Sequence, residues 1–417
     1  MSERYALAID GGTSFVEVAL VDIDRRRVVG DARVPNGQVF FGTNVLARLS
    51  AALSGSVTEL QCAVHESVLT AVEQMARGSI EDVLASVERI VVAANSVMAP
   101  LFCAIVPEGL VAAPFEPSRE AWCHTGPLIE AWRDARSDTT LKAEMLAPLA
   151  AFVGGDARAV LVATGLNTAP TAVPVSDPTD DDASSAFDGA PHLIVDLGTN
   201  AEIMLRNGDQ LSVASVPAGP TFEGMLGAGG AGLRGSDIIA MLDERLRSHA
   251  IDTTGLVVDP QRALPLTQED VRDFQLAKAA VRVGIDLLLE EASVSPDEVG
   301  TFTLVGAFGS ALDVTAATGL GMFDPALPSP TVFTEMQALD RSVERESDAT
   351  LNDSPDRIAT MDQSEGLRNA ALAGAVRVAL GESAEVSGTV VPLELASEAS
   401  FADAFLDALT LGVETVV

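Results

Sequence analysis

In the stretch Leu193–Asn200 (LIVDLGTN), three apolar residues are followed by an aspartate, and then by a glycine and a threonine. A second, mostly apolar run follows at Ala201–Leu205. This order predicts a β-hairpin whose tight turn exposes the backbone N–H groups of Gly198, Thr199 and Asn200. Such a turn can bind phosphate oxygens, and an aspartate at the end of a strand can hold Mg²⁺ or orient a water molecule.

The same pattern stands near the N-terminus as Leu7–Ser14 (LAIDGGTS), again followed by a strand-like run, Val16–Val21. Aligning the two stretches superimposes Asp10 on Asp196 and Gly12 on Gly198. A phosphate-binding turn that recurs half a chain apart predicts two similar lobes that face one nucleotide.

The composition fits an α/β protein with two domains or one large two-lobed unit, because the 417 residues are 47% hydrophobic and only 4% aromatic. The 60 acidic residues outnumber the 26 basic ones, which argues against nucleic acid or an anionic membrane as a partner. Solubility is the simpler reason for the charge. With neither a signal peptide nor a membrane span expected, the predicted location is the cytoplasm.

The cysteines and histidines predict no metal centre. Cys62, Cys103 and Cys123 have neither zinc nor iron–sulfur spacing, and the four histidines form no HxxxH pair. Reduced structural thiols are therefore expected.

Three further stretches complete the pattern, and a fourth stretch separates the two lobes. Asp156 follows two glycines at a predicted helix start, and Gly306–Ser310 is a strand–GxxG–helix junction. Asn369–Ala375 predicts a helix of small residues that can pack tightly on another helix. Asn167–Ala190, rich in Pro, Thr, Ser and Asp, predicts an acidic flexible loop, with a cation site as the alternative.

These motifs, in this order, resemble the acetate and sugar kinase, Hsp70 and actin (ASKHA) superfamily of ATPases. The resemblance implies an α/β fold of the two-lobed, actin-like or ribonuclease H-like kind, with duplicated βββαβα cores. The expected divisions are an N-terminal lobe over residues 1–166, the acidic loop over 167–190 and a C-terminal ASKHA lobe over 191–417.

Longer and more specific sequence motifs narrow the resemblance to the ATPase part of the reductive activators of corrinoid proteins. It rests on Asp196–Ile203, Ala218–Gly224, Leu266–Ala280 and Asn369–Ala375, and residues 1–166 resemble the middle-type domain of that family. In that family, ATP drives the return of inactive Co(II) to Co(I) in a corrinoid methyl-transfer protein. One departure is Ala94–Pro100 (ANSVMAP), where relatives tend to carry a histidine.

Cofactors and partners follow from this resemblance. ATP and Mg²⁺ are the implied cofactors, and the corrinoid protein of a methyltransferase system is the implied partner. Relatives begin with an iron–sulfur domain, whereas this chain begins at the first turn. We therefore expect no iron–sulfur cluster in it and a separate ferredoxin-like reductant. A homodimer is one candidate assembly.

The resemblance also assigns site residues. The candidate catalytic carboxylates are Asp10, Asp156, Asp196 and Glu223, of which Asp10 and Asp196 would hold Mg²⁺. Asp156, or else Glu223, would orient the attacking water, and a helix-cap or turn role is the alternative for both. The candidate nucleotide-binding residues are Gly11, Gly12, Thr13, Ser14, Gly198, Thr199, Asn200, Gly306, Ala307, Phe308, Gly309 and Ser310.

Three functions stay open at this point. The leading one is an ATP-dependent activator of a corrinoid protein. A small-molecule phosphotransferase of the acetate and sugar kinase branch would form ADP only with an added hydroxyl or carboxylate substrate. A nucleotide-binding scaffold would bind ATP and a partner without hydrolysis.

Overall fold

A computed structural model describes residues 4–76, 78–168, 189–198, 200–219, 235–306, 312–333, 369–393 and 399–412 of the chain. The chain forms two units, each built from two separate segments: residues 1–167 with 334–386, and residues 168–333 with 387–417. Residues 369–386, which the sequence assigned to the C-terminal lobe, thus belong to the first unit. The expected acidic loop lies outside the described residues from 169 to 188.

The first unit contains one six-stranded sheet and helices drawn from both of its segments. Its strands are β1 (Tyr5–Gly11), β2 (Phe15–Asp22), β3 (Arg27–Pro35), β4 (Val87–Ala93), β5 (Trp122–Cys123) and β6 (Ala143–Met145). Its helices are η1 (Gly37–Phe41), α1 (Val45–Ala51), η2 (Ala52–Ser56), α2 (Val57–Met75), α3 (Ile80–Ser86), α4 (Met98–Phe102), η3 (Glu108–Leu110), α5 (Pro127–Arg136), α6 (Gly155–Thr164) and α13 (Ala370–Ala379).

The sheet of the first unit runs in the order β3-β2-β1-β4-β6-β5. Strands β1, β2 and β3 form an antiparallel meander, and β4 pairs with β1 in parallel. Because side chains alternate along a strand, Leu7 and Ile9 of β1 point into the core that includes residues of α2. The smaller Ala6 and Ala8, which are also fully buried, point to the other face.

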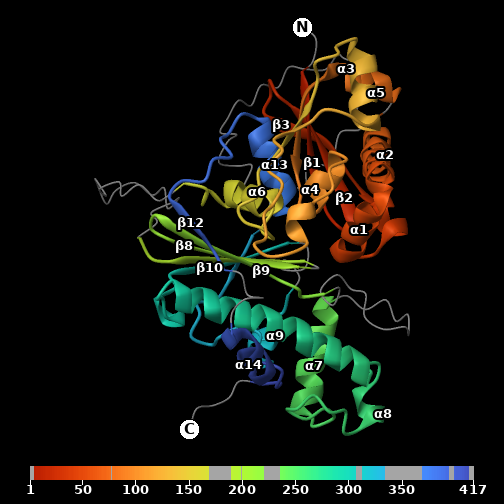
Figure 1. Cartoon of the computed structure of the whole chain (residues 1–417). Helices are drawn as coiled ribbons and strands as arrows, with labels where there is room; N and C mark the ends of the chain where they lie inside the picture. The colour runs from red at the N-terminus through yellow and green to blue at the C-terminus, as the bar shows by residue number, and fades with distance from the viewer. Residues whose placement is uncertain are drawn as a thin grey trace, which may run out of the picture. The chain divides into compact units, whose positions relative to one another are not determined.

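Helices α6 and α13, about 200 residues apart in the sequence, lie side by side in Figure 1, with α13 next to β1. Gly374 makes this approach possible, since a Cβ there would lie 1.9 Å from the carbonyl oxygen of Ala159 on α6. The small residues of Asn369–Ala375 therefore serve the tight helix packing that the sequence predicts.

The second unit also has a six-stranded sheet. Its strands are β7 (His192–Leu197), β8 (Ala201–Asn207), β9 (Gln210–Val216), β10 (Thr301–Val305), β11 (Thr331–Val332) and β12 (Thr389–Pro392). Its helices are α7 (Gly235–Arg247), α8 (Pro260–Ala263), α9 (Gln268–Glu291), η5 (Pro296–Glu298), α11 (Val314–Gly319) and α14 (Ala399–Asp407).

Comparison of the two sheets confirms the duplication. The order β9-β8-β7-β10 repeats β3-β2-β1-β4, with three antiparallel strands followed by a parallel one. The register is equivalent as well: Asp10 on β1 pairs with Ala93 on β4, and Asp196 on β7 pairs with Val305 on β10.

The long helix α9 runs along strands β8 and β9 (Figure 1). It begins at the predicted cap, where the Thr267 backbone N–H donates to Asp270 at 2.8 Å and the Asp270 N–H donates back to the Thr267 hydroxyl oxygen. Its predicted apolar face is buried, from Val271 and Phe274 through to Leu288. Burial of such side chains stabilises the unit by roughly 1.5–3 kcal/mol each. Within the described part of the chain, we find no helix with the length and apolarity to cross a bilayer.

Candidate functional site

The first predicted phosphate turn joins β1 to β2 through residues 12–14. A Cβ at Gly12 would lie 2.8 Å from the carbonyl oxygen of Phe15, so only glycine fits this bend. Asn36, which follows β3, holds the turn through two hydrogen bonds. Its amide Nδ2 donates to the Gly12 carbonyl at 2.8 Å, and its backbone N–H donates to the Ser14 carbonyl at 3.0 Å. Two turn carbonyls are thus fixed by one residue.

A buried arginine also supports the first turn. The Arg48 guanidinium, 1% exposed, donates to the Thr13 carbonyl at 2.7 Å, to the Gly42 carbonyl at 3.0 Å and to the Gln38 side-chain oxygen at 3.2 Å. Burial lowers the pKa of Arg48 to about 10, so the group still carries its charge at neutral pH. A fixed positive charge behind a turn favours an anion such as phosphate in front of it.

Asp10, at the end of β1, is bonded to a residue from the far end of the chain. Asn369 Nδ2 donates to Asp10 Oδ2 at 2.6 Å, while Asn369 Oδ1 caps α13 by accepting the Leu372 N–H. Glu17, the cross-strand partner of Asp10, also interacts with the Asn369 amide. Burial raises the pKa of Glu17, although Arg33 and Asn369 oppose the rise. One amide therefore serves two carboxylates on neighbouring strands.

Asp156 lies at the start of α6, as the sequence predicts, and Gly154 is the cap residue of that helix. Its Oδ1 accepts the N–H of Ala157 at 2.8 Å, which is the helix-end role left open as the alternative. The side chain keeps part of its surface exposed, yet desolvation by the surrounding protein still raises the pKa of Asp156 to about 6. A carboxyl that titrates so near neutrality is suited to take a proton from water.

Asn95 connects the start of α6 to the first turn. A Cβ at Gly154 would lie 2.5 Å from Asn95 Cα and 2.7 Å from Asp156 Oδ1, so the missing side chain brings these groups together. Asn95 Nδ2 in turn donates to the Thr13 hydroxyl at 3.3 Å. Asp156 and the first turn therefore belong to one local arrangement within the first unit.

The second turn, in the second unit, repeats part of this geometry. Asp196 at the end of β7 has Glu202 as its cross-strand partner, as Asp10 has Glu17. Gly306 follows β10 with φ +89°, and a Cβ there would lie 2.6 Å from Asp196 Oδ1. The glycine predicted to admit adenosine therefore lies against the carboxylate of the second turn.

One expectation for the second turn is wrong. The Gly198 N–H, predicted to be exposed for phosphate, donates to the Asn200 carbonyl at 3.0 Å and so closes the turn itself. Thr199, Glu223 and the four residues from Ala307 to Ser310 lie outside the described residues, so their assignments stay predictions.

Glu17, Arg48 and Asn369 were not among the predicted site residues, and neither were the supporting Asn36 and Asn95. The position of Asn369 before a helix of small residues predicts that it caps this helix. A cap residue does not by itself indicate a hydrogen bond to Asp10. Nothing in the local sequence around Arg48 sets it apart from a solvent-exposed helix residue.

The carboxylates present suit Mg²⁺ in their chemistry. Mg²⁺ binds hard oxygen ligands, keeps several waters and needs only one or two protein carboxylates. Asp10 ends its strand as a carboxylate with the Asn369 amide on one oxygen, and carboxylate oxygens are ligands of this hard kind. Larger clusters of three or more His, Cys, Asp or Glu suited to a metal do not occur among the described residues.

The sequence matches two regions of a known protein family. Residues 5–169 match the RACo middle region, and residues 190–231 and 244–334 match the C-terminal domain of RACo, the ASKHA domain. A solved structure, "Reductive activator for corrinoid, iron-sulfur protein", superimposes with a TM-score of 0.70 at 20% identity, over 98% of this chain and 66% of that one. The expected ASKHA-type α/β fold is confirmed.

Two characterised relatives are similar in sequence. The "Corrinoid activation enzyme RamQ" of Eubacterium limosum is 28% identical over 386 residues, which cover 76% of this chain and 60% of RamQ. The "[Co(II) methylated amine-specific corrinoid protein] reductase" of Methanosarcina barkeri is 22% identical over 384 residues, with 76% of this chain and 65% of the relative covered. The chain thus spans less than two thirds of the length of either. It belongs to the RACo family, of which it carries the middle region and the C-terminal ASKHA domain.

Proposed function

We propose that this chain is an ATP-dependent activator of a corrinoid protein, which it returns from Co(II) to Co(I) for methyl transfer. The observation that carries the proposal is the repeated strand-end aspartate, Asp10 and Asp196, each with a glutamate across the hairpin, in a chain with both RACo regions. The names of the two relatives, which refer to corrinoid activation and to a Co(II) corrinoid protein, support the choice of substrate.

The proposed roles follow from the contacts of the residues. The turn at Gly11–Ser14, next to the Arg48 charge, binds phosphate oxygens of ATP, and Thr199 and Asn200 of the second turn are also phosphate-binding residues. Asp10 and Asp196 hold Mg²⁺, which when bound neutralises the charge that develops on the phosphate oxygens. Asn369 fixes the carboxylate of Asp10, and Asp156 orients the water that attacks the γ-phosphate and accepts its proton. The products are ADP and inorganic phosphate.

The electron comes from a separate low-potential carrier of the ferredoxin type, since reduction of Co(II) to Co(I) takes one electron that ATP hydrolysis does not provide. Cys62 lies on α2, Cys103 follows α4 and Cys123 lies on β5. None of them has the spacing of a cluster ligand set.

The test combines the purified chain, ATP, a low-potential reductant and a Co(II) corrinoid protein, and follows Co(I) by absorbance. Co(I) should accumulate only with hydrolysable ATP. Asp10→Ala should abolish both ATP hydrolysis and Co(I) formation. Asp82→Ala, at an exposed position in the first turn of α3, is the matched control and should leave both rates unchanged. ADP formation that instead requires a small hydroxyl or carboxylate substrate would refute the proposal in favour of a phosphotransferase.

A further inference from the structure

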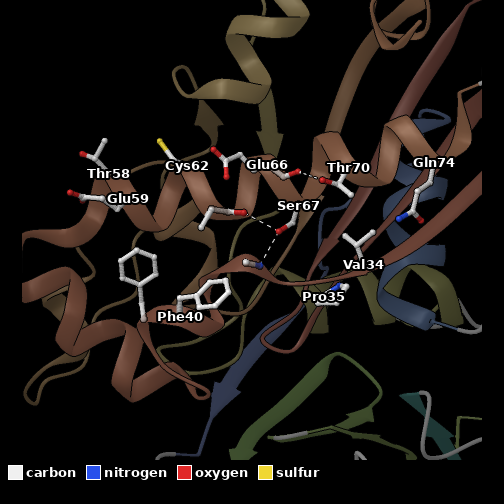
Figure 2. Close-up of a pocket in the computed structure, with 13 residues that line it drawn as sticks. Val34, Pro35, Phe40, Thr58, Glu59, Cys62, Glu66, Ser67, Thr70 and Gln74 are labelled. Atoms are coloured by element: carbon white, nitrogen blue, oxygen red, sulfur yellow. Dashed lines mark hydrogen bonds between the residues drawn. The ribbon is translucent and has the colours of Figure 1, made fainter. Parts of the chain in front are cut away.

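An open groove lies on the first unit, and its lining includes none of the carboxylates of the candidate site. One wall is the exposed face of α2 from Thr58 to Gln74, and the other is formed by the end of β3 and by η1, with Val34, Phe40 and Phe41 (Figure 2). The groove has a volume of about 690 Å³. Its lining on α2 extends from Thr58 to Gln74, a rise of about 24 Å along the helix axis.

The groove presents an aromatic side chain that the fold itself leaves unburied. Phe40 is 91% exposed. Together with Pro35 and Phe41 it gives the groove an apolar wall, and contiguous exposed apolar surface of this kind typically marks a contact with another molecule.

The charge in the groove has one sign. Glu59 and Glu66, both exposed, are seven residues apart on α2 and so lie on the same face of that helix, as Figure 2 shows. Glu73, a further seven residues on, is also exposed. The sequence Val57–Met75 contains neither lysine nor arginine, and no described lining residue is basic. An occupant would therefore be complementary if it carried lysine or arginine.

The groove is fixed in shape before anything binds. The Ser67 hydroxyl on α2 accepts the Gly37 N–H of η1 at 2.9 Å and donates to the Ala63 carbonyl at 2.9 Å, so its polar atoms are engaged (Figure 2). The next residue of η1, Gln38, is held to α2 as well, because its side-chain amide donates to the Leu60 carbonyl at 2.9 Å. Ser67 therefore presents no unengaged hydrogen-bonding atom to an occupant, which leaves the apolar wall and the glutamates to recognise it.

We propose that this groove docks an amphipathic helix of a partner protein, with an aliphatic or aromatic side chain against Phe40 and basic residues against Glu59 and Glu66. Helices recognised in this way present apolar residues at positions i, i+3 or i+4, and i+7. The basic residues of the partner would recur seven positions apart to match the glutamates. The proposal rests on this surface alone and does not depend on the reaction proposed above.

The test uses the full chain and three fluorescein-labelled 18-residue helical peptides in 0.15 M salt, read by fluorescence anisotropy. The first peptide has an apolar stripe of leucine and phenylalanine flanked by lysines seven residues apart. The second carries glutamate in place of each lysine, and the third carries serine in place of each apolar residue. Only the first should bind.

Variants of the groove then locate the binding. Phe40→Ala and the double variant Glu59→Lys with Glu66→Lys should each weaken the first peptide at least tenfold. Leu256→Ala and Glu290→Lys, which make the same kinds of change at exposed positions of the second unit, should change it less than twofold. Circular dichroism would verify that every variant is folded.

Three results would overturn the proposal. One is failure of the first peptide to bind at 1 mM or below, on the order of the weakest affinity that a specific contact shows. Another is equal binding to wild type and to the groove variants, which would mean attraction to the overall net charge. The third is self-association in sedimentation velocity that Phe40→Ala abolishes, because the occupant would then be a second copy of this chain.

Discussion

Asp156→Asn should make the first unit more stable at neutral pH, although it removes the proposed catalytic carboxylate. The folded protein raises the pKa of Asp156 from 3.8 to about 6, a gap that corresponds to about 3 kcal/mol. Above pH 7 the carboxyl is ionised in both the folded and the unfolded chain, so the folded state bears the full cost. The asparagine side chain has nearly the same shape, can still accept the Ala157 N–H and carries no charge.

The pH dependence gives this prediction its sign. As the pH falls through 6, the folded protein binds a proton that the unfolded chain does not, so the cost of burying the charge is progressively relieved. The advantage of Asp156→Asn should therefore shrink by roughly half between pH 7.5 and pH 5.

The assay is urea unfolding followed by tryptophan fluorescence. The only two tryptophans of the chain, Trp122 and Trp132, both lie in the first unit, so their signal reports the unit that contains Asp156. Asp82→Asn, in the first turn of α3 but exposed, is the matched control and should lose about 0.5 kcal/mol or less at either pH. An Asp156→Asn variant that is less stable than wild type at pH 7.5, or equally stabilised at both pH values, would refute the reasoning.

Three other substitutions test the support of the first turn and of α13. Asn369→Ala removes the cap of α13 and the amide that donates to Asp10. It should lower the unfolding free energy by about 1–2 kcal/mol and slow ATP turnover, and unchanged turnover would contradict a positioning role for Asn369. Arg48→Met leaves buried carbonyls without their donor and should cost about 3 kcal/mol and weaken the binding of an ATP analogue in calorimetry. Gly374→Val forces α13 away from α6 and should lower the unfolding free energy by about 3 kcal/mol or more, the upper range for overpacking, as measured by thermal unfolding. The control Gly78→Val, at a position with no neighbouring atom within 4 Å, should leave the stability nearly unchanged.

The sequence was sufficient for the parts of the fold that local patterns encode. The hairpin at Asp10 and its repeat at Asp196 follow from an apolar run, a turn and a second apolar run, and the structure gives both the predicted strands. The start of α9 was predictable for the same reason, because its cap lies within four residues of sequence.

Contacts between distant segments could not be predicted in this way. The bond between Asn369 and Asp10 joins residues 359 positions apart, and the Arg48 contact with Thr13 depends on how α1 packs behind the turn. The Gly198 amide was wrongly expected to be exposed because the turn sequence alone does not reveal which N–H closes the turn. The groove beside Phe40 was not predicted either, since a phenylalanine in an apolar run is usually buried.

The packing of Gly374 against Ala159 also governs how the first unit is made on the ribosome. Its sheet and α6 are complete by residue 167, but α13, which covers the Ala6 and Ala8 face, emerges about 200 residues later. At typical synthesis rates the nascent chain waits on the order of 10–40 s with that apolar face uncovered. A fragment that stops at residue 168 should therefore recruit chaperones and precipitate when expressed, and residues 369–386 supplied in trans should rescue it.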